Sequence, residues 1–178
     1  MQQNDGQPPS FAEMLADCHA SAVHLEMRDS YGIASESTDF QAWLAGDDSS
    51  RHDRTGRRKV WLDLVREATA RGVVMRRARV VSLPTSQYIK FSHEGTHLNV
   101  EAGEQVRWLS RRQASDLALP GNDFWLFDGR VVRFNHFTGE GGSGGPEVTE
   151  APAVAALCSS AFQSVWARGT EHSAFEVD

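Results

Sequence analysis

Apolar residues recur at helical spacing along several segments of the chain. Ser10 and Glu13 form a capping box, and the apolar positions that follow predict an amphipathic helix from residue 10 to about 27. Thr38, three residues before Gln41, predicts the start of a short second helix. The same spacing predicts three further helices, over residues 57–71, 86–101 and 152–167.

Runs of β-branched residues predict strands between these helices. Residues 73–81 form such a run, which Pro84 stops, and residues 106–109 are also expected to form a short strand. Gly72 lies where the helix before the first run should end, as a C′ residue. A helix that ends in glycine and leads directly into a strand is typical of α/β domains.

The clearest strand signal is a hairpin in the second half of the chain. Asp128 and Gly129 separate the apolar runs 124–127 and 131–137, and Asp-Gly in this position predicts a type I′ turn. The glycine-rich residues 139–146 that follow predict a flexible loop.

Together these elements predict an α/β fold, with α+β as the alternative. We expect a mixed sheet that carries a C-terminal hairpin and is flanked by helices. A single domain over residues 10–170 would lie between a flexible tail, residues 1–9, and a short C-terminal tail, residues 171–178.

Composition narrows the class of protein without indicating a function. The 178 residues are 40% hydrophobic and 24% charged, which is ordinary for a folded domain. No apolar run approaches the roughly 20 residues of a membrane helix, and the first residues lack the regions of a signal peptide. Cys18 and Cys158 lie in apolar patterns and are expected to be buried thiols. We therefore expect a cytoplasmic protein without a membrane partner.

The net charge of −6 conceals a basic segment in the middle of the chain. It begins in residues 46–56, a polar stretch without periodicity that predicts a loop. Ten basic residues lie within the 29 positions from 51 to 79: Arg51, Arg54, Arg57, Arg58, Lys59, Arg66, Arg71, Arg76, Arg77 and Arg79. A solvated loop and helix face explains such a segment, and the alternative is a docking surface for nucleic acid or an acidic protein.

One short motif carries a possible metal chemistry. His93, Glu94 and His97 match the pattern H-E-x-x-H, within a segment expected to be helical. Histidines four residues apart on a helix can share a zinc ion, and the glutamate could polarise a metal-bound water. The metzincin extension is missing, because Val100 and Gly103 stand where glycine and histidine would be. Zinc hydrolysis is thus an alternative, and a polar helix face is the simpler interpretation.

The strand predicted over 73–81 would place Arg77 and Arg79 on one face with apolar neighbours. Guanidinium groups on a buried face need carboxylate partners. Glu26 and Asp29 are the candidates, and such a network could be purely structural.

Several strings together resemble an actinobacterial family of unknown function of about this length. They are HLEMRDSY (24–31), RRARVVSLPTSQYIKF (76–91), AGEQVRWLSR (102–111) and DFWLFDG (123–129), so the resemblance covers roughly residues 10–170. It implies a protein encoded near Xre-type helix-turn-helix regulators or small acidic partner proteins. It implies no established activity, and H-E-x-x-H is not part of the family pattern.

A second similarity is to phospholipase-D-like domains. It rests on residues 103–109, on residues 123–129 with Val131 and Val132, and on the helix 162–166. Active members use a paired H-x-K motif, which this chain lacks, so the likeness implies a binding role without the nucleophile.

The sequence thus favours a non-enzymatic regulatory or protein-interaction module whose partner is a helix-turn-helix regulator or a small acidic protein. Its expected binding residues are His24, Glu26, Arg28, Asp29, Tyr31, Arg77, Arg79 and Tyr88. No catalytic residue and no cofactor are assigned. The alternatives are a hydrolase, either zinc-dependent through His93 and His97 or phosphodiesterase-like, and a nucleic-acid-binding module.

Overall fold

The computed structural model describes residues 8–32 and 34–178. Its helices are α1 (Phe11–Ala16), α2 (Ala34–Leu44), α3 (Ser49–His52), α4 (Gly56–Ala70), α5 (Gln87–Glu101) and α6 (Pro152–Arg168). Its strands are β1 (Ser21–Glu26), β2 (Val74–Val81), β3 (Gln105–Ser110), β4 (Asp123–Phe127), β5 (Val131–Phe137), β6 (Ser143–Thr149) and β7 (Thr170–Glu171). None of the helices in these residues is long and apolar enough to cross a bilayer.

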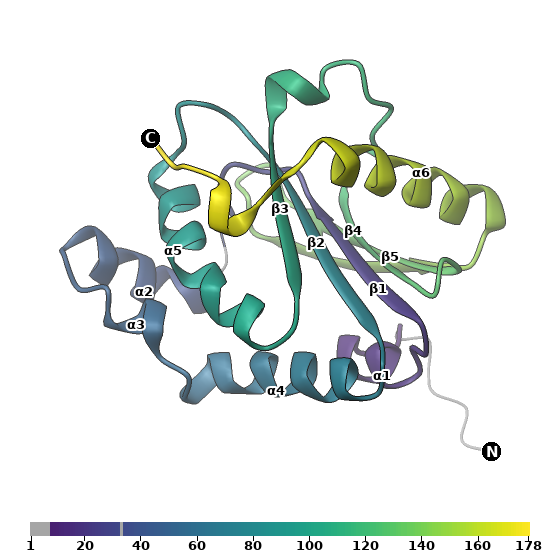
Figure 1. The fold of residues 1–178 in the computed structure, drawn as a ribbon, viewed down its shortest axis with the longest axis horizontal. Coiled ribbons are helices and arrows are strands. Elements are labelled where there is room, and N and C mark those ends of the chain that lie inside the picture. Colours follow the sequence, from purple (N-terminus) through teal and green to yellow (C-terminus); the bar gives the residue numbers. More distant parts are fainter. Residues whose placement is uncertain (1–7, 33) are drawn as a thin grey trace.

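The strands form one seven-stranded mixed sheet in the order β6-β5-β4-β1-β2-β3-β7. Strands β1, β2 and β3 are parallel to one another, and the other pairings are antiparallel. Strand β1 is central, and the chain extends the sheet on one side of it before it returns to the other side (Figure 1). The predicted α/β fold with a mixed sheet, a hairpin and flanking helices is confirmed.

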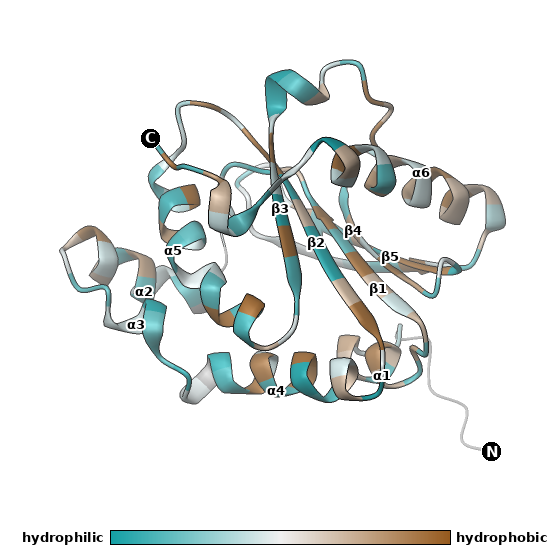
Figure 2. Cartoon of the chain, viewed as in Figure 1, coloured by the Kyte–Doolittle hydropathy of each residue, from teal (hydrophilic) through white to brown (hydrophobic). Residues whose placement is uncertain are grey.

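Helices cover both faces of the sheet. Helix α6 packs on one face, and the remaining helices lie on the other (Figure 1). Alternate strand residues serve the two layers: Leu25 and Ala78 join the core under α6, whereas Ala22 and Met75 join the core against α1 and α4. Helix α4 shows the corresponding apolar and polar stripes (Figure 2).

The prediction of one helix over residues 10–27 is wrong. Helix α1 ends at Ala16, and residues 21–26 form the central strand β1. Leu25 and Ala22 occupy helical spacing, but in β1 they lie on opposite faces of the sheet, each fully buried. A strand buried on both faces carries apolar residues at most positions, so periodicity alone does not separate it from a helix. Cys18 is therefore outside the helix, although it is buried, as Cys158 is.

Two predicted loops contain regular structure. Helix α3 occupies Ser49–His52 within the expected loop 46–56. Half of the glycine-rich segment belongs to β6, which pairs with β5 at the edge of the sheet, with an irregularity at His136/Phe137. Main-chain hydrogen bonds do not require side chains, and Pro146 is tolerated because an edge strand leaves one row of N–H groups unpaired.

The predicted hairpin joins β4 to β5 as expected. Asp128 and Gly129 have φ values of 50° and 66°, the positive values that a type I′ turn requires. The Asp128 carboxylate accepts hydrogen bonds from the backbone N–H groups of His19, Ala20 and Ser21, at 2.9, 2.7 and 2.9 Å. The turn thereby fixes the start of β1.

The ends of the chain are described in part. Residues 1–7 of the expected N-terminal tail lie outside the described residues. The expected C-terminal tail contacts the domain: Thr170 and Glu171 pair with β3, and Asp178 accepts a hydrogen bond of 2.7 Å from the backbone N–H of Thr85.

We predict that Asp128→Ala lowers the free energy of unfolding by roughly 2–4 kcal/mol at pH 7, because three backbone N–H groups lose a charged acceptor. Partial burial opposes ionisation of Asp128, but these hydrogen bonds outweigh it and hold its pKa at about 2. The stabilisation is therefore complete above pH 4 and disappears as the pH falls toward 2. Urea denaturation between pH 7 and pH 2 measures it. The exposed Asp17→Ala serves as the control, and an equal effect of both substitutions would contradict the role of Asp128.

Candidate functional site

A cavity of about 380 Å³ lies between the sheet and the helices opposite α6. Its floor comes from the strand register: His24 of β1 lies beside Arg77 of β2 on one side and Trp125 of β4 on the other, and Glu26 lies beside Arg79. His24 and Glu26 are in the carboxyl-terminal half of β1 and Arg79 is in that of β2, the end of parallel strands where open α/β sheets bind ligands.

Seven of the eight expected binding residues line the cavity, and they come from separate elements. They are His24, Glu26, Arg28, Tyr31, Arg77, Arg79 and Tyr88. Asp29 is not among the lining residues. Its carboxylate instead accepts hydrogen bonds from the backbone and side chain of Ser82, both at 2.7 Å, and lies 3.3 Å from Arg111 Nη2.

A buried ion network holds the floor together. The Glu26 carboxylate pairs with Arg77 and, at 2.6 Å, with Arg79 Nε, and Arg77 Nε donates to Glu104 at 2.8 Å. Burial opposes the charge on Glu26, but Arg79 and Arg77 outweigh it and hold the pKa of Glu26 at about 2. The expected pairing of Glu26 with both strand arginines is confirmed, whereas the pairing proposed for Asp29 is wrong. Asp29 lies beyond the end of β1, in reach of Arg111.

His24 is the exception in this network. The side chain is 7% exposed and stacks on Trp125, with ring centroids 4.3 Å apart. Its Nδ1 lies 3.5 Å from Glu26, but neither ring nitrogen makes a hydrogen bond to any described residue. Burial lowers the pKa of His24 well below its ordinary value, despite the charge of Glu26, so the ring is neutral. A neutral imidazole has one donor and one acceptor nitrogen, and both remain available here.

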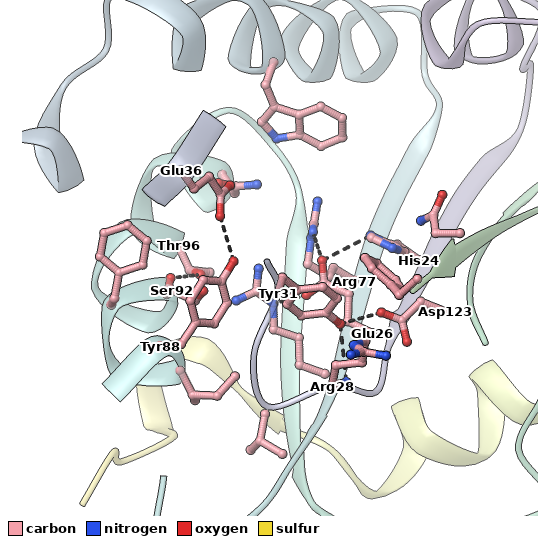
Figure 3. Close-up of a pocket in the computed structure, with 18 of the residues that line it drawn as sticks. His24, Glu26, Arg28, Tyr31, Glu36, Arg77, Tyr88, Ser92, Thr96 and Asp123 are labelled. Carbon is pink, nitrogen blue, oxygen red and sulfur yellow. Dashed lines mark hydrogen bonds and ion pairs between the residues drawn. The ribbon is translucent and has the colours of Figure 1, made fainter. Parts of the chain in front are cut away.

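Two tyrosines fix carboxylates that line the cavity (Figure 3). The Tyr31 hydroxyl donates to Asp123, and the Tyr88 hydroxyl donates to Glu36 at 2.7 Å. Burial raises the pKa of Asp123 to about 6, even though the hydrogen bond from Tyr31 lowers it. Both phenols hold their protons, because burial and the adjacent carboxylates raise their pKa values.

Two arginines from helices α3 and α4 also line the cavity. Arg51 of α3 is buried and stacks on Phe91, with 3.5 Å between its guanidinium carbon and the ring centroid. Arg58 of α4 donates to the backbone carbonyl of Gly95 at 2.8 Å. Burial and the charge of Arg58 lower the pKa of Arg51 to about 10, although Asp39 lies 3.6 Å away.

Fourteen lining residues were not among the expected binding residues. They are Glu36, Arg51, Arg58, Trp61, Val81, Ile89, Phe91, Ser92, Thr96, Asn99, Asp123, Trp125, Asn135 and Phe137. Strand alternation could have indicated three of them, because Asp123, Trp125 and Asn135 occupy the same face as His24 once the strand order is known. Arg51 carries no periodic signal, because it comes from a segment of polar residues.

The two histidines of the H-E-x-x-H motif, His93 and His97, contact different neighbours. Among residues 8–32 and 34–178, one group of three has metal-ligand atoms within 4.8 Å of one another, formed by Asp48, His52 and Glu94. The His97 ring lies 5.1 Å from that of His52, and its Nδ1 lies 2.7 Å from the Glu94 carbonyl oxygen. The His93 ring packs elsewhere, against Trp108, His172 and Phe175. His93 and His97 therefore do not gather three ligands around one position in these residues, as the zinc alternative requires.

Comparison with known proteins identifies a family without a known activity. The sequence model of the family described as "Domain of unknown function (DUF6879)" matches residues 9–177. No curated protein matches the chain. The expectation of an uncharacterised family is confirmed, whereas an actinobacterial source, neighbouring regulators and a phospholipase-D likeness stay predictions.

One of the solved structures that match this chain is similar over part of its own length. It is described as "Structure of TrmBL2, an archaeal chromatin protein, shows a novel mode of DNA binding", and it is 13% identical with a TM-score of 0.46. The match covers 90% of this chain and 48% of that chain, so this chain spans about half of its length.

We predict that Arg77→Ala lowers the free energy of unfolding by about 3–5 kcal/mol, because it leaves the buried Glu26 and Glu104 without their shared cation. Arg66→Ala is the matched control, since Arg66 is exposed and pairs only on the helix surface with Asp63. Urea denaturation compares the two variants. An unchanged midpoint for Arg77→Ala would refute the structural role of the network.

We also predict that His24→Phe leaves stability unchanged or raises it by about 1 kcal/mol, because it removes two unsatisfied buried polar atoms and keeps the stacking on Trp125. His24→Ala should instead destabilise by roughly 2 kcal/mol or more, because the ring leaves a void. Thermal and urea denaturation distinguish the outcomes. A loss above 1 kcal/mol for His24→Phe would show that the imidazole nitrogens support the fold.

Proposed function

Since this chain belongs to the DUF6879 family of unknown function, we propose from the cavity itself that the domain is a non-enzymatic module that binds a small organic anion. The observation that carries the proposal is His24, a buried neutral imidazole with two unsatisfied nitrogens on the floor of a cavity lined by arginines. Unsatisfied buried polar groups are rare in native proteins, and a bound molecule accounts for this one.

The charge of the lining supports an anion. Five arginines line the cavity, together with the carboxylates of Glu26, Glu36 and Asp123, and Glu104 outside the lining pairs with Arg77. Arginine recognises carboxylates and phosphates through paired N–H donors, and a partly enclosed site strengthens this attraction. The aromatic side chains of the lining would contact the apolar part of the same molecule, as in most small-molecule sites.

The state of the titratable groups favours binding over catalysis. Glu26 is held by two arginines, and the carboxyl group of Asp123 is held by Tyr31 and by the backbone N–H of Met27 at 2.9 Å. The depressed pKa of His24 makes its ring a weak base. The lining includes neither cysteine nor lysine, and Cys18 and Cys158 belong to the hydrophobic cores.

A regulatory role follows from this proposal. The cavity lies between the sheet and the helices α2, α3, α4 and α5, so a ligand would touch several elements at once. Occupancy could then change the surface that these helices offer to a protein partner, which we propose to be a helix-turn-helix regulator or a small acidic protein.

Direct binding of nucleic acid is the weaker alternative. The basic segment is divided among separate places: Arg51, Arg58, Arg77 and Arg79 line the cavity, Arg54 pairs with Glu101, Lys59 and Arg66 pair with Asp63, and Arg76 lies over Phe162 and Trp166. A continuous phosphate-binding face would need several of these charges on one exposed surface.

We expect small anions to raise the melting temperature of the protein. Native mass spectrometry of the purified chain and a thermal-shift panel of organic phosphates, carboxylates and sulfates test this. Ser92→Phe fills the cavity from α5 and should abolish the shift, whereas Ser160→Phe on the exposed side of α6 should keep it. A shift that persists in Ser92→Phe would place the ligand outside the cavity. No bound molecule and no shift would reject the proposed function.

A further inference from the structure

An imidazole and two carboxylates from separate elements meet between α3 and α5. They belong to Asp48, which precedes α3, to His52 at the end of α3, and to Glu94 of α5. His52 Nε2 lies 3.9 Å from Asp48 Oδ2 and 3.8 Å from Glu94 Oε1, and one ligand atom of each residue lies within 4.8 Å of the others. Asp48 and His52 are four residues apart, so a single helical turn presents both side chains to α5.

The Glu94 carboxylate is oriented by its neighbours. The indole N–H of Trp43 in α2 donates to Glu94 Oε2, and Oε1 faces His52. A hydrogen bond to the second oxygen is the usual outer-shell support of a carboxylate that binds a metal. His97 donates its Nδ1–H to the backbone carbonyl of Glu94 at 2.7 Å, and its ring lies 5.1 Å from that of His52. The lone pair of a neutral His97 is therefore on Nε2, and a second imidazole borders the group.

Helix α3 depends on α5 for its position. It has four residues, too few to be a stable helix by itself. Arg51 stacks on Phe91 of α5 at 3.5 Å and pairs with Asp39 at 3.6 Å. Phe91 and Glu94 are three residues apart and share one face of α5. An ion bound by His52 and Glu94 would therefore fasten α3 next to the stacked guanidinium, which is part of the cavity wall.

The donor atoms select the class of cation. An imidazole combined with carboxylates suits zinc, whereas Mg²⁺ and Ca²⁺ prefer oxygen ligands alone. Ligands of a tetrahedral zinc ion are about 3.3 Å apart, for bonds of about 2.0–2.1 Å. The three atoms must thus approach one another by about 0.5–1.5 Å, which rotation of the exposed Asp48 and His52 side chains permits. Water would take the fourth position, on the exposed side.

We propose that Asp48, His52 and Glu94 bind a zinc ion that fastens α3 to α5. The site shares Glu94 with the H-E-x-x-H motif, but its imidazole comes from α3 and not from His93. The charge of Glu94 also acts on Arg51, so zinc competes with a guanidinium group and should exchange with a chelator. The inference is independent of the anion proposed for the cavity, because the two ligands bind different side chains.

Isothermal titration and native mass spectrometry of the full chain, without a histidine tag and after treatment with EDTA, test the site. One zinc ion should bind per chain and leave again when EDTA is added. An equal concentration of Mg²⁺ or Ca²⁺ should not displace it. Zinc should also slow amide hydrogen exchange across α3, because local opening of this helix would then require release of the ion.

Variants locate the ion. His52→Ala and Asp48→Ala should each weaken zinc binding by about tenfold or more, since loss of an outer-shell partner alone costs about ten- to a hundredfold. Both side chains are exposed, so the variants should fold as the parent does. His136→Ala is the matched control: His136 Nε2 lies 2.9 Å from Glu147 Oε2, but this pair has no third ligand among the described residues.

Four results would overturn this inference. They are the absence of zinc binding by both methods, zinc binding that is unchanged in His52→Ala, an effect of His136→Ala as large as that of His52→Ala, and displacement of zinc by an equal concentration of Mg²⁺. Zinc binding without slower exchange in α3 would likewise contradict the proposed link between the two helices.

Discussion

The fold depends on one buried arrangement of charge, in which Arg77 lies between Glu26 and Glu104. These residues come from β1, from β2 and from the turn after α5, so all three segments must assemble before Arg77 has both of its carboxylate partners. Removing one partner of a buried pair leaves an uncompensated charge, which is far more unfavourable than an ordinary loss of contact. The arrangement thus favours the observed parallel register of β1 and β2. That register in turn determines on which face of the sheet the remaining polar residues of these strands lie.

The same register explains why a polar cavity can exist inside a small domain. Leu25, Ala78 and Phe124 place their side chains under α6 and form a dry core. Their neighbours in sequence, among them His24 and Arg77, point to the opposite side and share the space beneath α4 and α5. The core under α6 is therefore apolar throughout, while the other face combines two apolar clusters, packed on α1, α4 and α5, with a recessed polar centre.

Much of the fold could be predicted, because its signals are local. Glycine at a helix end, β-branched runs and the Asp128-Gly129 turn each act through a few residues, and the structure confirms them. The central strand β1 was mistaken for helix, because a strand with apolar residues on both faces has no period of two. The strand β6 could not be seen, because backbone pairing at an edge leaves no trace in side-chain pattern.

The candidate site was predictable only where its residues are close in sequence or repeat along one strand. The string from His24 to Tyr31 and the pair Arg77 and Arg79 belong to that class. The sequence identified Arg51 and Arg58 as part of a basic segment but did not predict which way their side chains point. Arg51 was expected in a loop and Arg58 at the start of a helix, where no periodic pattern of apolar residues indicates a buried face. Asp29 was assigned to the wrong partner, because the chain turns away after β1 toward Arg111, which is remote in sequence.

The ligand site proposed at the unsatisfied imidazole of His24 also implies a consequence for the turnover of the protein. A ligand that binds only the folded chain adds its binding free energy to folding, about 2.7 kcal/mol at a concentration one hundred times its dissociation constant. Proteases act on molecules that open, and the open population falls steeply with such an increase. A domain with this cavity would accumulate when its ligand is abundant and be degraded when it is scarce, so its own lifetime would report the concentration of the ligand.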